Sequence, residues 1–455
     1  MNVETSPRVA ADAALAIGKI IDAAPISGYQ IRVVTLCALL LFFDGFDTQI
    51  IAFIAPSVSG EFQLTRTQLG PLFAASIVGI MVGALFFGPL ADRYGRRMII
   101  LFCAAEFSIL TLASAASTSF TMLLALRFLT GLGLGGAMPN ASSLTAEYSP
   151  RRRRATMVMA AFLGFGLGAG VGGLVSAWLL PIYGWRGVLT VGGALPFLLV
   201  IVSYFILPES IRFLVLKNVP SDRITQALKR IVPGFEAPAG ARYTVETEGS
   251  RGMPVTQLFR ARPPVATLLL WFIFFATLLT NFTILNWIPT LSHDLGISLE
   301  QAVLIGTLYQ IGGVIASLVL GFPIDKFGPF KIIPAMFAVA VPTIVLIGQV
   351  GAAVGALMAL AFVAGFCISG GLNCCNALAA LFYPTAVRST GSGWALGIGR
   401  IGAVIGPIAA GWLLANNFSM GSLFVIIAIV PACAAVACIG MSLVARRVNY
   451  AEELD

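Results

Sequence analysis

The chain has 455 residues, of which 58% are hydrophobic and only 11% are charged, and its mean hydropathy is +0.93. A soluble globular domain does not have this composition, and apolar runs of about 20 residues indicate transmembrane helices. The net charge of +8 does not indicate nucleic-acid binding, because the basic residues lie between the apolar runs and not on one soluble face. We therefore expect an all-α integral membrane protein.

Twelve apolar runs are long enough to cross a bilayer. In chain order they cover about 31–56, 69–91, 97–116, 120–144, 155–180, 187–207, 264–291, 299–324, 332–350, 353–381, 390–414 and 423–444. They predict an N-terminal segment 1–30, a six-helix lobe 31–207, a polar linker 208–263, a second six-helix lobe 264–444 and a tail 445–455. Within the linker, Ser221 to Ile231 is predicted to form a short amphipathic helix with Ser221 as its N-cap.

The basic residues predict the orientation in the membrane. All but four of the 28 Lys and Arg residues fall on the side of the linker and the two termini. Arg66 and Arg186 fall on the other side, and Arg127 and Arg400 fall within spans. Because basic loops stay in the cytoplasm, we expect the linker and both termini to be cytoplasmic.

The first span contains two aspartates, Asp44 and Asp47, in an otherwise apolar stretch. Residues three apart share one face of a helix, and an ionisable side chain at bilayer depth normally faces a partner or a wet cavity. Two neighbouring carboxylates repel each other, which favours protonation of one of them, as a proton carrier requires. The alternative is a structural polar pair that a neighbouring helix neutralises.

Two arginines lie inside spans. Arg127, in the fourth, always carries charge and needs a carboxylate, so Asp44 or Asp47 is the expected partner; a purely structural salt bridge is the alternative. Arg400, in the eleventh, has no carboxylate in the spans of its own lobe. Its planar fork matches a substrate carboxylate, although it could instead balance the charge of the first lobe.

Other polar residues in or beside the spans do not indicate a specific function. Glu106, in the third span, receives no assigned role, and His293, at the outer end of the seventh, is expected at the surface. The seven cysteines lie in apolar spans without metal-ligand spacing, so no metal site is predicted.

The two lobes repeat a loop motif. Gly88-Pro-Leu-Ala-Asp92 follows the second span, and Gly321-Phe-Pro-Ile-Asp325 follows the eighth. Parallel six-helix repeats joined by a long linker indicate a two-lobed transporter with its substrate near the midplane of the membrane. The loops are expected to close the cytoplasmic side, with Asp92 near Arg388 and Asp325 near Arg154. The predicted gating residues are Gly88, Asp92, Arg96, Asp325, Arg388 and Arg154.

These motifs resemble the major facilitator superfamily. The loop Gly88 to Arg97, the segment Arg127 to Gly133 and the glycine-rich segment Gly164 to Gly173 are similar to motifs of its second loop and of its fourth and fifth helices. Within the superfamily, four features resemble the aromatic acid:proton symporter family, especially its 4-hydroxybenzoate and protocatechuate transporters. They are Asp44-Gly-Phe-Asp47, Met138-Pro-Asn-Ala141, Glu147-Tyr148, and Tyr383-Pro384-Thr385 with Gly397-Ile-Gly-Arg400. The resemblance covers about residues 28 to 445.

The resemblance implies a symporter that imports a small aromatic carboxylate with protons across the bacterial inner membrane by alternating access, as a monomer and without a cofactor. The proton-coupling residues that follow are Asp44, Asp47, Arg127 and Glu147. Because aromatic side chains stack on a benzoate ring and amides bind a ring hydroxyl, further residues are expected at the substrate. The substrate-binding residues are predicted to be Arg400, Trp394, Phe43, Tyr309, Gln310, Asn373 and Asn376.

Two other functions remain open. Pro208-Glu209-Ser210 also resembles the sugar porter branch, so the solute could be a sugar or an exported drug, and a membrane sensor could share the fold. Arg400 together with the paired aspartates favours a carboxylate, because a neutral sugar needs no buried cation. The sequence contains no phosphate-binding glycine loop and no catalytic set, so neither ATP-driven transport nor an enzyme is expected.

Overall fold

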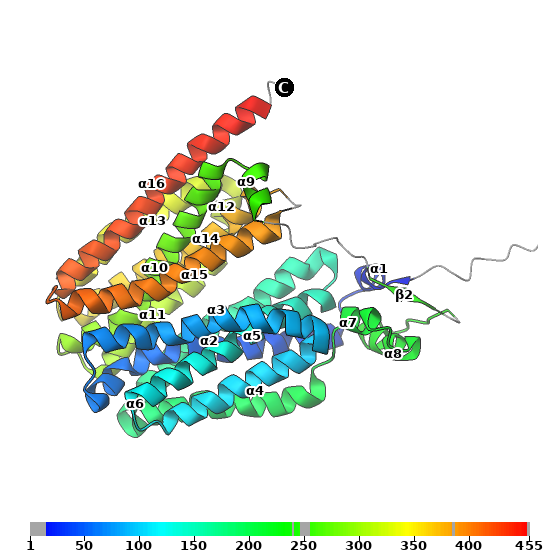
Figure 1. The fold of residues 1–455 in the computed structure, drawn as a ribbon, viewed down its shortest axis with the longest axis horizontal. Helices are drawn as coiled ribbons and strands as arrows, with labels where there is room; N and C mark the ends of the chain where they lie inside the picture. The colour runs from blue at the N-terminus through cyan, green and yellow to red at the C-terminus, as the bar shows by residue number, and fades with distance from the viewer. Residues whose placement is uncertain (1–14, 239–240, 246–254, 385–386, 453–455) are drawn as a thin grey trace, which may run out of the picture.

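A computed structural model describes residues 15–238, 241–245, 255–384 and 387–452, and the fold is almost entirely helical (Figure 1). Within these residues, eleven helices are long and apolar enough to cross a membrane. The predicted all-α membrane class is therefore confirmed. The predicted segment 1–30, linker and tail, and Thr385 of the quoted motif, lie partly or wholly outside the described residues.

The first lobe, which we call the N-lobe, is built from five long helices. They are α2 (Gly28–Phe62), α3 (Arg66–Tyr94), α4 (Arg96–Ala115), α5 (Phe120–Tyr148) and α6 (Arg154–Ile206), with a single 3₁₀ turn at Arg151–Arg153 before α6. A kink at Gly184, with φ 64° and ψ −173°, divides α6 into the fifth and sixth predicted spans. This kink explains how eleven helices account for twelve apolar runs.

The linker and the N-terminal segment form small elements, most of them beside the N-lobe; the last of them, Thr256–Ala261, packs against the second lobe (Figure 1). They are β1 (Leu15–Ala16), α1 (Ile17–Ala23), α7 (Ile211–Leu216), α8 (Ser221–Ile231), β2 (Tyr243–Thr244) and α9 (Thr256–Ala261). The two strands pair in parallel, with Leu15 opposite Tyr243. The predicted helix in the linker is confirmed as α8, but its predicted cap is wrong. Pro220 holds the N-cap position, and Ser221 is already helical and makes no capping bond.

The second lobe, the C-lobe, repeats the packing of the first. Its helices are α10 (Pro264–Asp294), α11 (Leu299–Val319), α12 (Gly321–Phe327), α13 (Pro329–Gln349), α14 (Val354–Phe382), α15 (Arg388–Ala415) and α16 (Met420–Glu452). The contact of α3 with α5 corresponds to that of α11 with α14, and the contact of α2 with α6 to that of α10 with α15. Gly95 and Gly328 make equivalent bends at φ 102° and 78°, a region that glycine adopts without strain.

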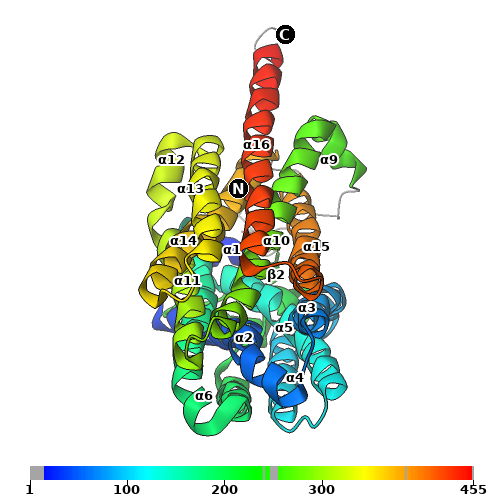
Figure 2. The same ribbon diagram turned by 90° about the vertical axis from the view of Figure 1, so that its left-hand side faces the viewer.

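The two lobes touch at the end of the molecule opposite the linker. There α3 packs on α15, and α6 packs on α11. Arg66 pairs with Asp294 across the lobes at 2.6 Å, and the ring of Phe73 meets that of Trp287 edge-on with centroids 5.4 Å apart. On the linker side the helices of the two lobes diverge (Figures 1 and 2). The conformation is thus closed at one end only.

Glycines bring α2 and α6 into direct backbone contact. A Cβ atom on Gly45 would overlap the carbonyl oxygen of Phe165, and one on Gly168 would overlap the carbonyl oxygen of Phe42. Small residues allow helices to approach this closely in a membrane protein. The contact fixes the stretch of α2 that carries Asp44 and Asp47.

A methyl group at this contact should destabilise the fold. Gly168→Ala should cost about 1–3 kcal/mol, because the carbonyl of Phe42 belongs to the backbone and the two helices must separate. Gly60→Ala is the matched control, since nothing lies within 4 Å of a Cβ at that position of α2. Thermal unfolding in detergent measures both variants. Equal midpoints for the two would contradict the close approach.

Candidate functional site

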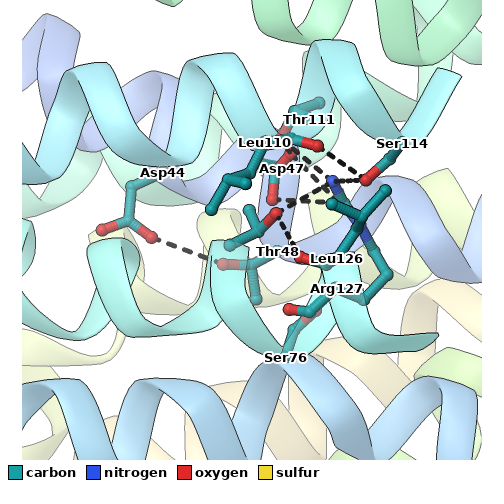
Figure 3. Close-up of polar contacts among 10 residues, drawn as sticks. Asp44, Asp47, Thr48, Ser76, Leu110, Thr111, Ser114, Leu126 and Arg127 are labelled. Atoms are coloured by element: carbon teal, nitrogen blue, oxygen red, sulfur yellow. Dashed lines mark hydrogen bonds and ion pairs between the residues drawn. The ribbon is translucent and has the colours of Figure 1, made fainter. Parts of the chain in front are cut away.

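A buried ion pair lies at the centre of the N-lobe (Figure 3). Arg127 of α5 is 0% exposed, and its Nη1 lies 3.3 Å from each carboxylate oxygen of Asp47 on α2. Asp47 was one of the two expected partners of Arg127. Because both charges are out of water, each depends on the other for compensation.

Three hydroxyl groups also contact the guanidinium of Arg127, whose Nε is buried and has no hydrogen-bond partner among the described residues. Its Nη2 donates to Thr111 and Ser114 of α4 at 3.0 Å and to Thr130 of α5 at 3.2 Å. Thr111 also donates to Asp47 at 2.6 Å. The pair is therefore held by α2, α4 and α5 without any contribution from the C-lobe.

Asp44 lies in a different environment although it is only one turn from Asp47. It is 2% exposed, and the Thr48 hydroxyl donates to its Oδ1 at a long 3.4 Å. Its Oδ2 is buried and has no hydrogen-bond partner among the described residues. Figure 3 shows its carboxylate apart from the Arg127 cluster, with Thr48 as its one drawn contact. The charge of Asp44 is thus not compensated within the N-lobe.

Arg400 provides the opposite charge from the C-lobe. It lies in the middle of α15 and is partly buried. No ion pair to it is found in the described part of the chain. Asp44 of the N-lobe and Arg400 of the C-lobe thus carry opposite charges, and neither has an ion-pair partner in the described part of the chain. A guanidinium in this setting can still accept a carboxylate ligand.

The other predicted substrate residues lie on helices of the C-lobe and, for Phe43, on α2. Tyr309 is 0% exposed and donates to Asn281 at 2.9 Å, so it lies inside the lobe. Trp394 stacks on Trp271 with ring centroids 5.9 Å apart. Phe43 and Gln310 are half-buried, Asn376 is exposed, and Asn373 is exposed and donates to Ser317 at 2.6 Å.

Glu147 lies away from the residues with which it was grouped. It is 20 residues from Arg127 on the same helix, which is about 30 Å along the axis. It pairs with Nε of Arg96 at 2.9 Å and accepts a hydrogen bond from Ser210 after α6. Glu147 thus joins the gating residue Arg96 at the linker end of the N-lobe.

The predicted gating contacts are not formed in this conformation. No ion pair joins Asp92 to Arg388, or Asp325 to Arg154, although all four residues belong to the described chain. Asp92 and Asp325 are exposed, and a Cβ on Gly88 would meet open space. This agrees with lobes that touch at the opposite end. The two contacts remain predictions for a conformation closed on the linker side.

Sequence reasoning missed several polar groups of the structure. The hydroxyls of Thr111, Ser114 and Thr130 were not singled out, nor was the pair between Arg66 and Asp294. Hydroxyl residues are common in membrane helices and carry no distinctive spacing. The two residues left without a role are now placed: Glu106 packs over Gly133 of α5, and His293 is exposed.

Comparison with known proteins identifies a matching family and several similar transporters. Residues 37–290 and 270–453 match the profile of the Major Facilitator Superfamily. The chain is 43% identical to the 4-hydroxybenzoate transporter of Pseudomonas aeruginosa over 91% of this chain and 92% of that one. It is 41% identical to the gallate transporter of Pseudomonas putida over 93% and 94%. A bacterial homolog of the human lysosomal transporter Spinster, solved in an inward-facing and unoccupied conformation, superposes with a TM-score of 0.72 at 17% identity, covering 92% of this chain and 98% of that one.

The buried pair predicts an asymmetric response to substitution. Asp47→Asn should destabilise the protein by about 3–5 kcal/mol, because it leaves the charge of Arg127 buried without a counter-ion. The double variant Asp47→Asn/Arg127→Gln should recover most of this loss. Asp44→Asn is the control in the same helix and should have a smaller effect. Thermal unfolding in detergent tests the set, and an Asp47→Asn protein as stable as Asp44→Asn would contradict the ion pair.

Proposed function

The chain belongs to the Major Facilitator Superfamily and, within it, to the aromatic acid transporters, and from this we propose that it imports a small aromatic carboxylate together with protons. Relatives named for 4-hydroxybenzoate and gallate support a hydroxylated benzoate as the substrate. We place the transporter in the bacterial inner membrane as a monomer without a cofactor. The Lys and Arg residues between the spans support cytoplasmic termini and a cytoplasmic linker.

One observation carries the proposal: the buried Oδ2 of Asp44 has no hydrogen-bond partner, and neither Asp44 nor Arg400 of the other lobe has an ion-pair partner among the described residues. A substrate carboxylate that binds Arg400 brings a second negative charge to the region between the lobes, in addition to that of Asp44. Two anions then share one cation, and a proton on Asp44 removes the excess negative charge. Binding of the anion and binding of the proton therefore support each other. This mutual dependence is what symport requires.

Asp47 and Arg127 have a different role in this scheme. Asp47 already accepts two bonds from Arg127 and one from Thr111, so its charge is compensated with or without substrate. The pair fixes α2 against α4 and α5, and so fixes the position of Asp44 one turn away. We assign proton binding to Asp44 and positioning to Asp47 and Arg127. Glu147, which lies with Arg96, is assigned to the gate.

Alternating access follows from the contacts at the two ends. Arg66 and Asp294 close the end opposite the linker in this conformation. In the opposite conformation these contacts would break, and the loops of Asp92 and Asp325 would close the linker side near Arg388 and Arg154. With the linker in the cytoplasm, the present conformation faces inward.

Replacement of Asp44 should separate transport from proton coupling. Asp44→Asn should abolish accumulation of 4-hydroxybenzoate driven by a pH gradient, because an amide cannot bind the proton. Exchange of labelled for unlabelled substrate should persist, since it needs no net proton movement. Uptake and counterflow in proteoliposomes measure the two activities. Full accumulation by Asp44→Asn would exclude Asp44 as the proton site.

Replacement of Arg400 should act on the substrate carboxylate. Arg400→Ala should weaken 4-hydroxybenzoate binding by about 2–5 kcal/mol, because the bound anion loses its charged partner. Arg400→Lys should recover part of the affinity, since an ammonium gives a point charge without the planar fork. Calorimetry measures both variants.

The methyl ester of 4-hydroxybenzoate and a neutral sugar serve as controls. The ester should bind the wild type weakly and lose little further in Arg400→Ala, because it has no carboxylate to lose. If acid and ester weakened equally, Arg400 would only balance charge between the lobes. Tight binding of the sugar instead of the acid would overturn the assignment of the solute class.

A further inference from the structure

Three side chains form a buried polar cluster inside the C-lobe. Asn281 comes from α10, Tyr309 from α11 and Ser369 from α14. The Tyr309 hydroxyl donates to Oδ1 of Asn281 at 2.9 Å, and the Ser369 hydroxyl donates to the same oxygen at 2.7 Å. Two donors on one oxygen saturate its lone pairs and fix the orientation of the amide.

The nitrogen of the same amide has no such partner. Nδ2 of Asn281 donates a hydrogen bond to no atom of the described chain. The residue as a whole is only 7% exposed, but this nitrogen is not fully buried. An amide nitrogen carries two N–H donors, and here both remain available to water or to a ligand. A buried amide held in this way is prepared to bind an acceptor from outside the protein.

Three other asparagines, in or directly after a helix, bond locally, whereas Asn373 donates to Ser317. The Nδ2 atoms of Asn140, Asn286 and Asn416 each donate at 2.8 Å to the carbonyl oxygen four residues earlier in the helix. That local bond satisfies the amide without any ligand. Asn281 has given up this local bond, and Tyr309 and Ser369 hold it in the alternative orientation.

Asn281 lies on the helix that packs against the helix of Arg400. Leu278 of α10 fills the space above Gly399, which is adjacent to Arg400 on α15. Asn281 is three residues further along α10, about 4.5 Å towards the end where the lobes touch. Asn281 and Arg400 therefore lie on neighbouring, directly packed helices of the C-lobe.

We infer that Asn281 determines substrate specificity by donating a hydrogen bond to the hydroxyl oxygen on the aromatic ring, and that Tyr309 and Ser369 are positioning residues for its amide. The inference rests on the proposed transport of an aromatic carboxylate and assigns the recognition of the second polar group of that substrate. A site built to bind a hydroxyl rejects the analogue that lacks it, because its own polar group then stays without a partner. The transporter should accordingly prefer 4-hydroxybenzoate to benzoate.

The experiment compares the affinities of these two acids for the purified full-length protein by calorimetry. Asn281→Ala should weaken binding of 4-hydroxybenzoate about tenfold and leave that of benzoate nearly unchanged, so that the preference is lost. Asn286→Ala is the matched control on the same helix, because the amide of Asn286 is satisfied by its own backbone, and it should keep the preference. If Asn281→Ala does not fold, Tyr309→Phe provides the test, since it removes one of the two hydroxyls that orient the amide and should reduce the preference without weakening benzoate binding.

Three results would overturn the inference. If the wild type binds both acids equally, it does not recognise the ring hydroxyl. If the preference for 4-hydroxybenzoate survives in both variants, residues other than Asn281 recognise the hydroxyl. Equal weakening of both acids in Asn281→Ala and in Tyr309→Phe would show a structural effect only. In all three cases benzoate still binds through its carboxylate, so the proposed function stands. A wild type that binds neither acid would remove the proposed function and this inference together.

Discussion

The cost of placing charge inside a membrane protein organises this structure. The charges of Arg127 and Asp47 compensate each other within the N-lobe, where a carboxylate and three hydroxyls contact one guanidinium. Asp44 and Arg400 do not, because neither has an ion-pair partner among the described residues. The first arrangement is a permanent part of the fold. The second depends on what lies between the lobes, and a ligand can therefore change it.

The two lobes divide the chemistry of the proposed transport. The N-lobe holds the proton site at Asp44, on a helix fixed by the backbone contact of Gly45 and Gly168 with their neighbours. The C-lobe holds Arg400 for the carboxylate and, on our inference, Asn281 for the ring hydroxyl. Contacts between lobes at the end opposite the linker, such as Arg66 with Asp294, close one side while the other stays open. Substrate and proton thus meet at the surface along which the lobes move.

The sequence predicted the features that follow from the spacing of apolar runs and from the repeated loop motif. Apolar runs gave the spans and the repeated loops gave the two lobes, whereas the kink at Gly184 merges two spans into α6. Spacing alone could not decide which aspartate pairs with Arg127, because Asp44 and Asp47 lie on the same face of α2. Thr130 and Ser114 were not singled out because such hydroxyls also bond to the carbonyl four residues earlier, as these two do at 2.8 and 2.7 Å. Glu147 was grouped with the proton site by resemblance, and only the length of α5 shows that it lies with Arg96.

The most direct test of the account counts the protons that the purified transporter takes up when 4-hydroxybenzoate binds. Calorimetry over a range of pH, in buffers with different ionisation enthalpies, gives this number without any membrane. If binding of the anion favours protonation of Asp44, the wild type should take up protons as the anion binds, and Asp44→Asn should take up none. Binding without proton uptake in the wild type, or equal uptake in both proteins, would contradict the coupling between Asp44 and Arg400.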